Sequence, residues 1–330
     1  MTVARIALLA ALSPICAIGG LLVAMVVPDD TVWGYALQAL LLSALPWWML
    51  LWPIISLILY LNHRIPRPAA LISIIGLPLA GWPPLQTTDA PGADILVANV
   101  NAYTGNDSVL EAFFAEASAD AVITIEKRGA TIPGMLRVAD NYDEKLPRPS
   151  HASAVYCRQD LAAGRCQGRV TEQIGSPGIR MPVALLRLDG VCVLGVHAPP
   201  PYPRDASGIR PYIQHIAERI EEGRLAVAWA PCQPGDPAIV AGDLNAVPRS
   251  RPLRTLRAQG LEDQQRFSGV HGLTWPSGGG WPDFPLLRLD HLLVSPTLNV
   301  TLQEHLDLPD SDHRGLWFRV SASRPSNSPR

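Results

Sequence analysis

Two long apolar stretches without a charged residue lie in the first 84 residues, and they constrain the fold of this chain more than any other feature. One runs from Ile6 to Val27 and the other from Thr31 to Leu61. A membrane-spanning helix needs about 20 predominantly apolar residues, so each stretch is long enough to cross a bilayer. A cleaved signal peptide fits the first stretch poorly, because its apolar run is long and another follows directly. We therefore predict a transmembrane anchor of two to three helices over residues 1–84.

The charges that flank these stretches predict their orientation. Basic residues precede the first stretch and follow the second, whereas acidic residues lie between them: Arg5, Arg64 and Arg67 against Asp29 and Asp30. Because cytoplasmic loops are enriched in Lys and Arg, the amino terminus and the loop after the second stretch are predicted to be cytoplasmic.

A third apolar run, Ala69 to Trp82, decides on which side of the membrane the remaining chain lies. Pro78 interrupts it, and at about 1.5 Å per helical residue it reaches only about 21 Å. If it crosses, which we favour, everything after it is extracytoplasmic, on the periplasmic side of the inner membrane. If it lies on the surface, the rest of the chain stays in the cytoplasm.

The cysteines favour the same side. Beyond Cys16, four cysteines remain, at positions 157, 166, 192 and 232. An even number suits disulfides in an oxidising compartment. Cys157 and Cys166, which flank a short polar connection, are the favoured pair; free buried cysteines are the alternative. None has zinc-ligand spacing with a histidine.

From residue 85 onward the chain is slightly acidic. Three of its 27 basic residues and two of its 29 acidic residues lie before that point, which leaves 24 against 27. Proteins that grip duplex DNA usually present a basic face, and no Lys/Arg cluster stands out here. The charge balance therefore lowers the expectation of a nuclease without excluding a local basic patch.

Residues 85–93 form a Pro/Thr/Asp-rich linker, and residues 94–322 alternate between strand and helix patterns. We expect strands at Asp94–Val100, Ala121–Ile125, Ser153–Cys157, Met181–Leu188, Val191–Val196, Ala238–Ala241, Leu289–Val294, Val300–Leu306 and Leu316–Val320. Helices are expected at Val109–Ala117, at Ile209–Ile220 and from Leu253 to about Gly260. This is an α/β pattern, and we expect residues 94–322 to form one domain. Residues 323–330, polar and rich in Pro and Ser, are predicted to be disordered.

Polar side chains recur where the apolar strands end. Asp243 and Asn245 follow one strand and, two residues apart, project to the same side of an extended chain. The same placement holds for Asn99, Glu126 and His197, while Asp290 opens a strand and Asp312–His313 precede one. Each could separately be a turn residue. Polar groups delivered to one rim by several buried strands are, however, how α/β enzymes assemble a site.

These residues match a known pattern, and residues 94–321 resemble the endonuclease/exonuclease/phosphatase (DNase I-like) superfamily. The matching pieces are Ala98-Asn99-Val100, Ile125-Glu126, His197, Gly242-Asp243-Leu244-Asn245-Ala246, Thr274-Trp275-Pro276, Leu289-Asp290-His291 and Ser311-Asp312-His313-Arg314. Gly-Asp-Leu-Asn-Ala and Ser-Asp-His are the specific ones. With its apolar front, the chain resembles a membrane-anchored bacterial branch of this superfamily.

The resemblance implies a four-layer α/β sandwich, two packed β-sheets flanked by helices, and Mg²⁺- or Mn²⁺-dependent hydrolysis of phosphate esters. It implies that Glu126 is the principal metal ligand, with Asp312 and Asn99 close to the metal. Asn101 stands where some relatives carry an aspartate, which leaves one or two metals open. A hard cation of this kind takes oxygen ligands and keeps several waters, so few carboxylates are needed.

The resemblance also implies the catalytic roles. Asp243 would orient or deprotonate the attacking water, and Asn245 would hold a phosphate oxygen. His313, paired with Asp290, would contact the scissile phosphate, and His197 would bind it from another side. The remaining histidines, His63, His151, His215, His271, His291 and His305, are interpreted as surface or packing residues.

The leading functional hypothesis is a membrane-anchored phosphodiesterase or phosphatase whose partners are the lipid bilayer and a phosphate-ester substrate. The anchor and the acidic domain favour a phospholipid or other surface substrate. The frequency of nucleic-acid substrates in the superfamily favours nucleic acid instead. A catalytically inactive binding module is the alternative from another class, which the complete residue set argues against. No obligate protein partner is evident.

Overall fold

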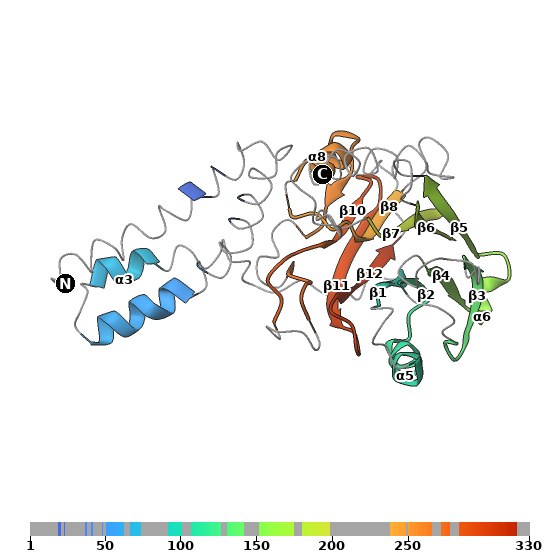
Figure 1. Cartoon of the computed structure of the whole chain (residues 1–330), viewed down its shortest axis with the longest axis horizontal. Helices are drawn as coiled ribbons and strands as arrows, with labels where there is room; N and C mark the ends of the chain where they lie inside the picture. The colour runs from blue at the N-terminus through green and yellow to red at the C-terminus, as the bar shows by residue number, and fades with distance from the viewer. Residues whose placement is uncertain are drawn as a thin grey trace, which may run out of the picture.

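In the computed structural model, the described residues are 51–62, 67–73, 92–100, 107–126, 131–141, 152–174, 180–198, 238–248, 250–265, 272–277 and 284–321, with a few positions before residue 50. Within them, two six-stranded β-sheets pack face to face (Figure 1). The two-sheet α/β architecture predicted from the sequence is therefore confirmed.

The first sheet has the strand order β11-β12-β1-β2-β4-β3. Its strands are β1 (Ala93–Asn99), β2 (Ala121–Ile125), β3 (Met135–Asp140), β4 (Ser153–Arg158), β11 (Asn299–Asp307) and β12 (Arg314–Ser321). β1 runs parallel to β2, and the other pairs are antiparallel. The carboxyl ends of β1 and β2 consequently lie side by side.

The second sheet has the order β5-β6-β7-β8-β10-β9. Its strands are β5 (Cys166–Ile174), β6 (Arg180–Leu188), β7 (Val191–Val196), β8 (Ala238–Asp243), β9 (Glu262–Asp263) and β10 (Asp290–Val294). Its one parallel pair is β7 with β8, so the carboxyl ends of these two strands also meet. Each sheet thus places two neighbouring strand ends at the same rim.

Alternation along the strands divides the core into three layers. Ile123 and Ile239 belong to the central layer between the sheets. On the outer face of the first sheet, Leu96 packs with residues of helix α5 (Asp107–Ala117). On the outer face of the second sheet, Val240 packs with residues of helix α8 (Arg251–Ala258). This order of helix, sheet, sheet and helix gives the four layers that the resemblance implied (Figure 1).

Two glycines let the sheets approach closely beside the ends of β7 and β8. A Cβ atom on Gly195 would lie 2.5 Å from Cγ2 of Ile123 in the opposite sheet. A Cβ on Gly242 would lie 2.9 Å from Cδ1 of Ile125 in the opposite sheet, and φ at Gly242 is +122°, a conformation that favours glycine. Here a side chain would force the two sheets apart.

Nine predicted strands and two of the three predicted helices are present, but three strands were missed. β3 and β5 are edge strands, and β9 is only two residues long. The side chains of β3 alternate poorly between buried and exposed, and β5 is largely polar. Edge strands bury little surface, so their sequences lack the apolar pattern that marks a central strand. The predicted helix at Ile209–Ile220 and the predicted tail lie outside the described residues.

The predicted Cys157–Cys166 disulfide is present and joins β4 of the first sheet to β5 of the second. The intervening residues form the short helix α6 (Gln159–Ala162). Cys192, on β7, is also disulfide-bonded. A covalent link between the two sheets limits their separation at this edge of the sandwich.

Much of the predicted membrane anchor, including nearly all of Ile6–Val27, lies outside the described residues. Residues 51–61 are helical, and helix α3 spans Arg67–Ser73, at the start of the third apolar run. In the described part of the chain, no helix has both the length and the apolar composition to cross a membrane.

Candidate active site

The candidate residues converge where β1, β2, β7 and β8 end. Asn99 closes β1, Glu126 follows β2, His197 follows β7, and Asp243 closes β8. Asn99, His197 and Asp243 lie on the face that meets the other sheet, because they keep the alternation of the central core. Glu126 directly follows Ile125 of that core, and its backbone leaves the extended conformation with a φ of +62°. The packing of the two sheets therefore brings together groups that are far apart in the sequence.

Asp243 and Asn245 form a turn in which they bond to each other directly. The backbone N–H of Asn245 donates to Oδ1 of Asp243 at 2.6 Å, and Nδ2 of Asn245 donates to Oδ2 of Asp243 at 2.8 Å. The Asn245 amide also donates to the carbonyl oxygen of Ala198 at 2.7 Å, just past β7. Asn245 adopts a left-handed φ of +47°, which asparagine tolerates better than most residues. Leu244, between them, packs in the outer core of the second sheet.

Asn99 connects the first sheet to this turn. Its Nδ2 donates to Oδ2 of Asp243 at 3.2 Å, and its side chain is buried. Its carbonyl oxygen Oδ1 is also buried but has no hydrogen-bond partner among the described residues. A buried amide oxygen without a donor is costly, and a cation would satisfy it.

Glu126 and His197 face each other across the sheet interface. Nε2 of His197 lies 3.3 Å from Oε1 of Glu126 and 3.8 Å from Oδ2 of Asp243. The Glu126 side chain is partly exposed, whereas that of His197 is buried. Glu126 adopts a left-handed φ of +62°. Such conformations are unfavourable for a residue with a Cβ and cluster at functional sites.

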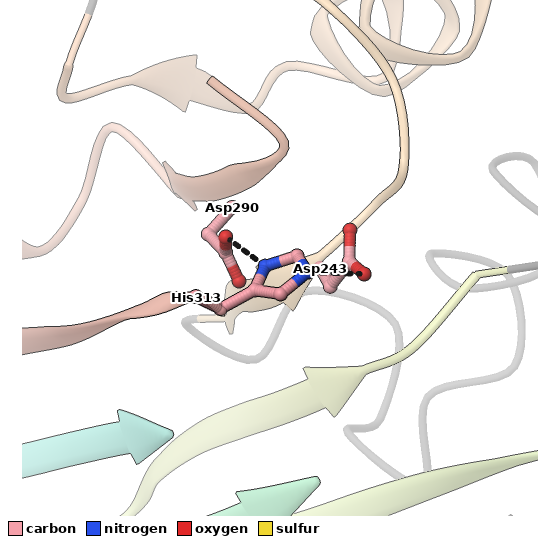
Figure 2. A group of neighbouring side chains, drawn as sticks. All are labelled: Asp243, Asp290 and His313. Carbon is pink, nitrogen blue, oxygen red and sulfur yellow. Dashed lines mark hydrogen bonds and ion pairs between the residues drawn. The ribbon is translucent and has the colours of Figure 1, made fainter. Parts of the chain in front are cut away.

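Asp290 and His313 form a buried hydrogen-bonded pair (Figure 2). Asp290 opens β10 and His313 lies just before β12, so each sheet supplies one member. Nδ1 of His313 and Oδ2 of Asp290 are 2.8 Å apart, and Nε2 of His313 lies 3.8 Å from Oδ2 of Asp243. A carboxylate at Nδ1 fixes the tautomer and orientation of the ring, which leaves Nε2 facing the turn at Asp243.

Backbone contacts tie both members of this pair to their neighbours. The hydroxyl of buried Thr274 accepts the N–H groups of Leu289 and Asp290, each at 3.1 Å. Just before β12, Ser311 donates its hydroxyl hydrogen to the backbone carbonyl oxygen of Asn99 at 2.8 Å. The same hydroxyl accepts the backbone N–H of His313 at 3.1 Å. The loop before β12 is thus tethered to the end of β1.

Asp312 lies beside the same pair. Its Oδ2 accepts the indole N–H of Trp275 at 3.1 Å, and its carbonyl accepts the N–H of Ser277 at 2.9 Å. Its negative charge acts to raise the pKa of His313. The segment around Thr274 therefore contacts both strands that carry the Asp290–His313 pair.

Burial and charge shift the acid–base properties of the site. Burial raises the pKa of Asp243 to about 8, against an opposing effect of the neighbouring His313. For His313, burial acts to lower the pKa, but the carboxylates of Asp290 and Asp243 outweigh it and raise the pKa to about 10. Both groups thus bind a proton more readily than in water, and the site holds a cationic histidine between two buried carboxyl groups at neutral pH.

Among the described residues, the side chains of Asp243, Asp290 and His313 could hold a metal ion, since each places a ligand atom within 4.8 Å of the others. The direct bond from His313 to Asp290 already uses two of these atoms. The resemblance implied a different set, Asn99, Glu126 and Asp312, whose oxygen atoms are the ligand type that hard cations prefer.

A family model described as the endonuclease/exonuclease/phosphatase family matches residues 87–313. This match covers more than half of the chain and runs from the linker to the Ser311–His313 motif. The chain belongs to this family. Members of the endonuclease/exonuclease/phosphatase family are generally metal-dependent phosphoester hydrolases.

Several solved structures are similar to the chain. A 3′ phosphatase from Neisseria bound to a product DNA hairpin is 19% identical, covering 69% of this chain and 99% of its own, with a TM-score of 0.48. An AP endonuclease from Archaeoglobus fulgidus is 13% identical over 70% of this chain and 100% of its own, with a TM-score of 0.49. A Bacteroides thetaiotaomicron mannosyl-6-phosphatase is 13% identical over 69% and 99%, with a TM-score of 0.46. No curated protein matches the chain significantly.

The structure brings together all eight site residues predicted from the sequence: Asn99, Glu126, His197, Asp243, Asn245, Asp290, Asp312 and His313. Asn101 lies outside the described residues. Of the six histidines interpreted as surface or packing residues, His291 and His305 are buried, and the other four lie outside the described residues. The contacts of Ser311, Trp275 and the Ala198 carbonyl were not predicted, because no local pattern marks a group that acts on a residue distant in sequence.

Proposed function

We propose that this endonuclease/exonuclease/phosphatase family protein hydrolyses phosphate esters with a divalent cation, Mg²⁺ or Mn²⁺. The observation that carries the proposal is the convergence of Asn99 and Glu126 from one sheet with Asp243 from the other, beside the Asp290–His313 pair. A cationic imidazole and a cation held by oxygen ligands can bind an anionic phosphate. A carboxylate beside them can direct a water onto it.

Glu126 and Asn99 would hold the cation, with Asp312 close by. The residues present fit such an ion, because the Asn99 Oδ1 atom is buried without a partner in the described part of the chain, and the Glu126 carboxylate is partly exposed at the rim. When bound, the cation would neutralise charge that develops on the phosphate.

Asp243 is proposed to orient or deprotonate the attacking water. Its two oxygens accept N–H groups from Asn99 and Asn245, which fixes the carboxylate rigidly. Burial raises its pKa to about 8, so the carboxyl group acts as a base in its ionised form, which predominates above about that pH, and is then a stronger base than an exposed aspartate. The Asn245 carboxamide is held by the same turn, and both of its N–H groups are donated, to Asp243 and to the Ala198 carbonyl. We propose that one of these N–H groups turns to a phosphate oxygen when substrate binds.

His313 and His197 are proposed to bind the phosphate from two further sides. His313 remains protonated at neutral pH, since the pKa is raised to about 10, and its Nε2 faces Asp243. An imidazolium at that point stabilises an anionic phosphate before and during attack. Asp290 keeps the ring in that orientation through Nδ1.

An activity panel with the full-length protein tests this proposal. Phospholipids, phosphoinositides, single- and double-stranded nucleic acids and sugar phosphates would be incubated with Mg²⁺, with Mn²⁺ and with EDTA. We expect hydrolysis of at least one ester that EDTA abolishes. Hydrolysis of phospholipid alone would favour a surface substrate, and hydrolysis of nucleic acid alone would favour a tethered nuclease. Binding without turnover across the panel would support an inactive binding module.

We further propose that the chain is anchored in a membrane with its catalytic domain on the periplasmic side. Residues 51–61 support this proposal, because six large aliphatic side chains of that helical segment are 40–64% exposed: Leu51, Ile54, Ile55, Leu57, Ile58 and Leu61. Apolar surface of this extent is unfavourable in water. The Cys157–Cys166 disulfide supports the oxidising side of the membrane.

Membrane anchoring and sidedness can be tested separately. After extraction with carbonate, the full-length protein should remain in the membrane fraction. In spheroplasts, added protease should cleave the domain while a cytoplasmic marker stays intact. Recovery in the soluble fraction would contradict the anchor, and full protection from protease would contradict the periplasmic placement.

A further inference from the structure

His291, which the proposed chemistry does not use, is completely buried behind the active site. It follows Asp290 on β10, and neighbouring residues of a strand face opposite sides of the sheet. Asp290 faces the first sheet, so His291 faces the outer layer, on the same side as Leu293, which packs in that layer with residues of α8. The histidine thus approaches the turn at Asp243 and Asn245 from the outer face of the second sheet.

The contact that His291 makes there defines its tautomer. Nε2 lies 2.6 Å from the carbonyl oxygen of Ala246. A carbonyl oxygen only accepts hydrogen bonds, so Nε2 carries the hydrogen and donates it. Nδ1 is buried without a hydrogen-bond partner among the described residues. A hydrogen at Nδ1 would be an unsatisfied buried donor, so His291 is neutral with its hydrogen on Nε2.

Ala246 is the residue directly after Asn245, whose turn has an unfavourable left-handed φ of +47°. On the side of the first sheet, that turn is held by the bonds from Asn245 to Asp243 and to the Ala198 carbonyl. His291 holds the next peptide from the other side of the second sheet. The turn is therefore fixed from both faces, and the Ala246 carbonyl would lose this partner without the histidine.

We propose that His291 is a positioning residue: by donating Nε2–H to the Ala246 carbonyl, it holds the turn in which Asn245 presents its carboxamide to the substrate phosphate. The part that concerns the phosphate rests on the proposed function. The part that concerns the turn rests only on the contacts between His291, Ala246 and Asn245.

Hydrogen–deuterium exchange of the full-length protein tests the effect on the turn without any substrate. His291→Phe keeps the ring but removes the donor, and His291→Asn is too short to reach Ala246. His291→Gln places an amide N–H near the position of Nε2. Leu293→Val, on the same face of the same strand, is the matched control. We expect the peptide that covers residues 243–247 to exchange at least about tenfold faster in the Phe or Asn variant. The Gln variant and the control should match the wild type.

Kinetics of the same variants test the effect on the phosphate site. Losing one hydrogen bond that positions Asn245 should lower kcat/KM by about tenfold, and His291→Gln should recover most of that loss. In an Asn245→Ala background, His291→Phe should change kcat/KM by less than about twofold, because the group that it positions is gone. A merely structural role would give the full loss in both backgrounds.

The outcomes separate this inference from the proposed function. Unchanged exchange in both donor-free variants, or equally fast exchange in Leu293→Val, overturns the role of His291 in the turn. Additive kinetic losses overturn its action through Asn245. If the wild type hydrolyses no ester, the proposed function is wrong and the kinetic part of the inference falls with it, while the exchange result still decides the structural part.

Discussion

The two sheets contribute to the candidate site in different ways. The second sheet forms its part locally, since Asp243 and Asn245 are two residues apart and bond to each other directly. The first sheet contributes through contacts across the interface, such as the bond from Asn99 to Asp243, 144 residues away. His313, before a strand of the first sheet, bonds to Asp290 of the second.

This difference shows which part of the site depends on the packing of the sheets. The turn at Asp243 is held by bonds within the second sheet, from Asn245 to Ala198 and from His291 to Ala246. The proposed cation ligands Asn99 and Glu126 reach it only when the sheets are in contact. Changes in the turn should therefore affect turnover with little loss of stability. Changes at the interface should affect stability and the site together.

The largest effect is expected from Asp243→Asn, which alters the turn of the second sheet and the bond that Asp243 accepts from Asn99. The amide keeps the shape and one acceptor oxygen but is no longer a base. General acid–base catalysis contributes about 10²–10⁴-fold, so kcat should fall by at least that order while the free energy of unfolding changes little. Steady-state kinetics and urea unfolding would measure both. If Asp243 were only a turn residue, asparagine would serve equally well, and near-wild-type turnover would refute its catalytic role.

Gly195→Ala disturbs the interface instead. The added Cβ would lie 2.5 Å from Cγ2 of Ile123 in the first sheet, and overpacking of a core costs about 1–3 kcal/mol. We expect a loss of that size in urea unfolding, with reduced activity. In the double variant with Ile123→Ala, the loss of stability should be smaller than the sum of the losses in the two single variants, because the clash is removed. Strict additivity would show that the close approach of the sheets is not the cause.

Glu126→Gln tests the part that the first sheet supplies. Replacing a carboxylate ligand by an amide weakens binding of a hard cation, so the Mg²⁺ concentration for half-maximal activity should rise about tenfold or more. Asp290→Asn is the matched control: it should lower kcat without changing the Mg²⁺ requirement. The reverse pattern would place the cation at Asp243, Asp290 and His313.

The last expected effect is a pH dependence of stability that comes from the outer face of the second sheet. Burial lowers the pKa of His291 to about 3, from 6.5 in the unfolded chain. Between these pH values the unfolded state binds more protons. The stability of the wild type is therefore fully present above about pH 6.5 and falls as the pH drops toward 3, by up to about 1.4 kcal/mol per pH unit. His291→Gln lacks this group, so its loss of stability from pH 6 to pH 4 should be smaller. Parallel curves in urea unfolding would contradict a buried neutral histidine.

Much of the fold could be predicted because its central strands are apolar and end in polar residues. The strands that were missed, β3, β5 and β9, lie at sheet edges or are very short, so little burial shaped their sequences. The disulfide between Cys157 and Cys166 was favoured by their spacing, although spacing cannot show that the bond joins two different sheets. For His291, the sequence indicated packing but not its contact with the Ala246 carbonyl.

The sequence by itself determined that the candidate site residues lie at strand ends, and its resemblance to the family implied that they could form a phosphate-ester site. Alternation along a strand and the preference of Asp, Asn and Gly for turns are local properties, so they can be read from neighbouring residues. Only the tertiary structure decided that Asn99, Glu126 and His197 meet the turn at Asp243, and that Asp290 bonds to His313. Those contacts depend on how two sheets pack, and the packing depends on small residues such as Gly195 and on side chains far away in the chain.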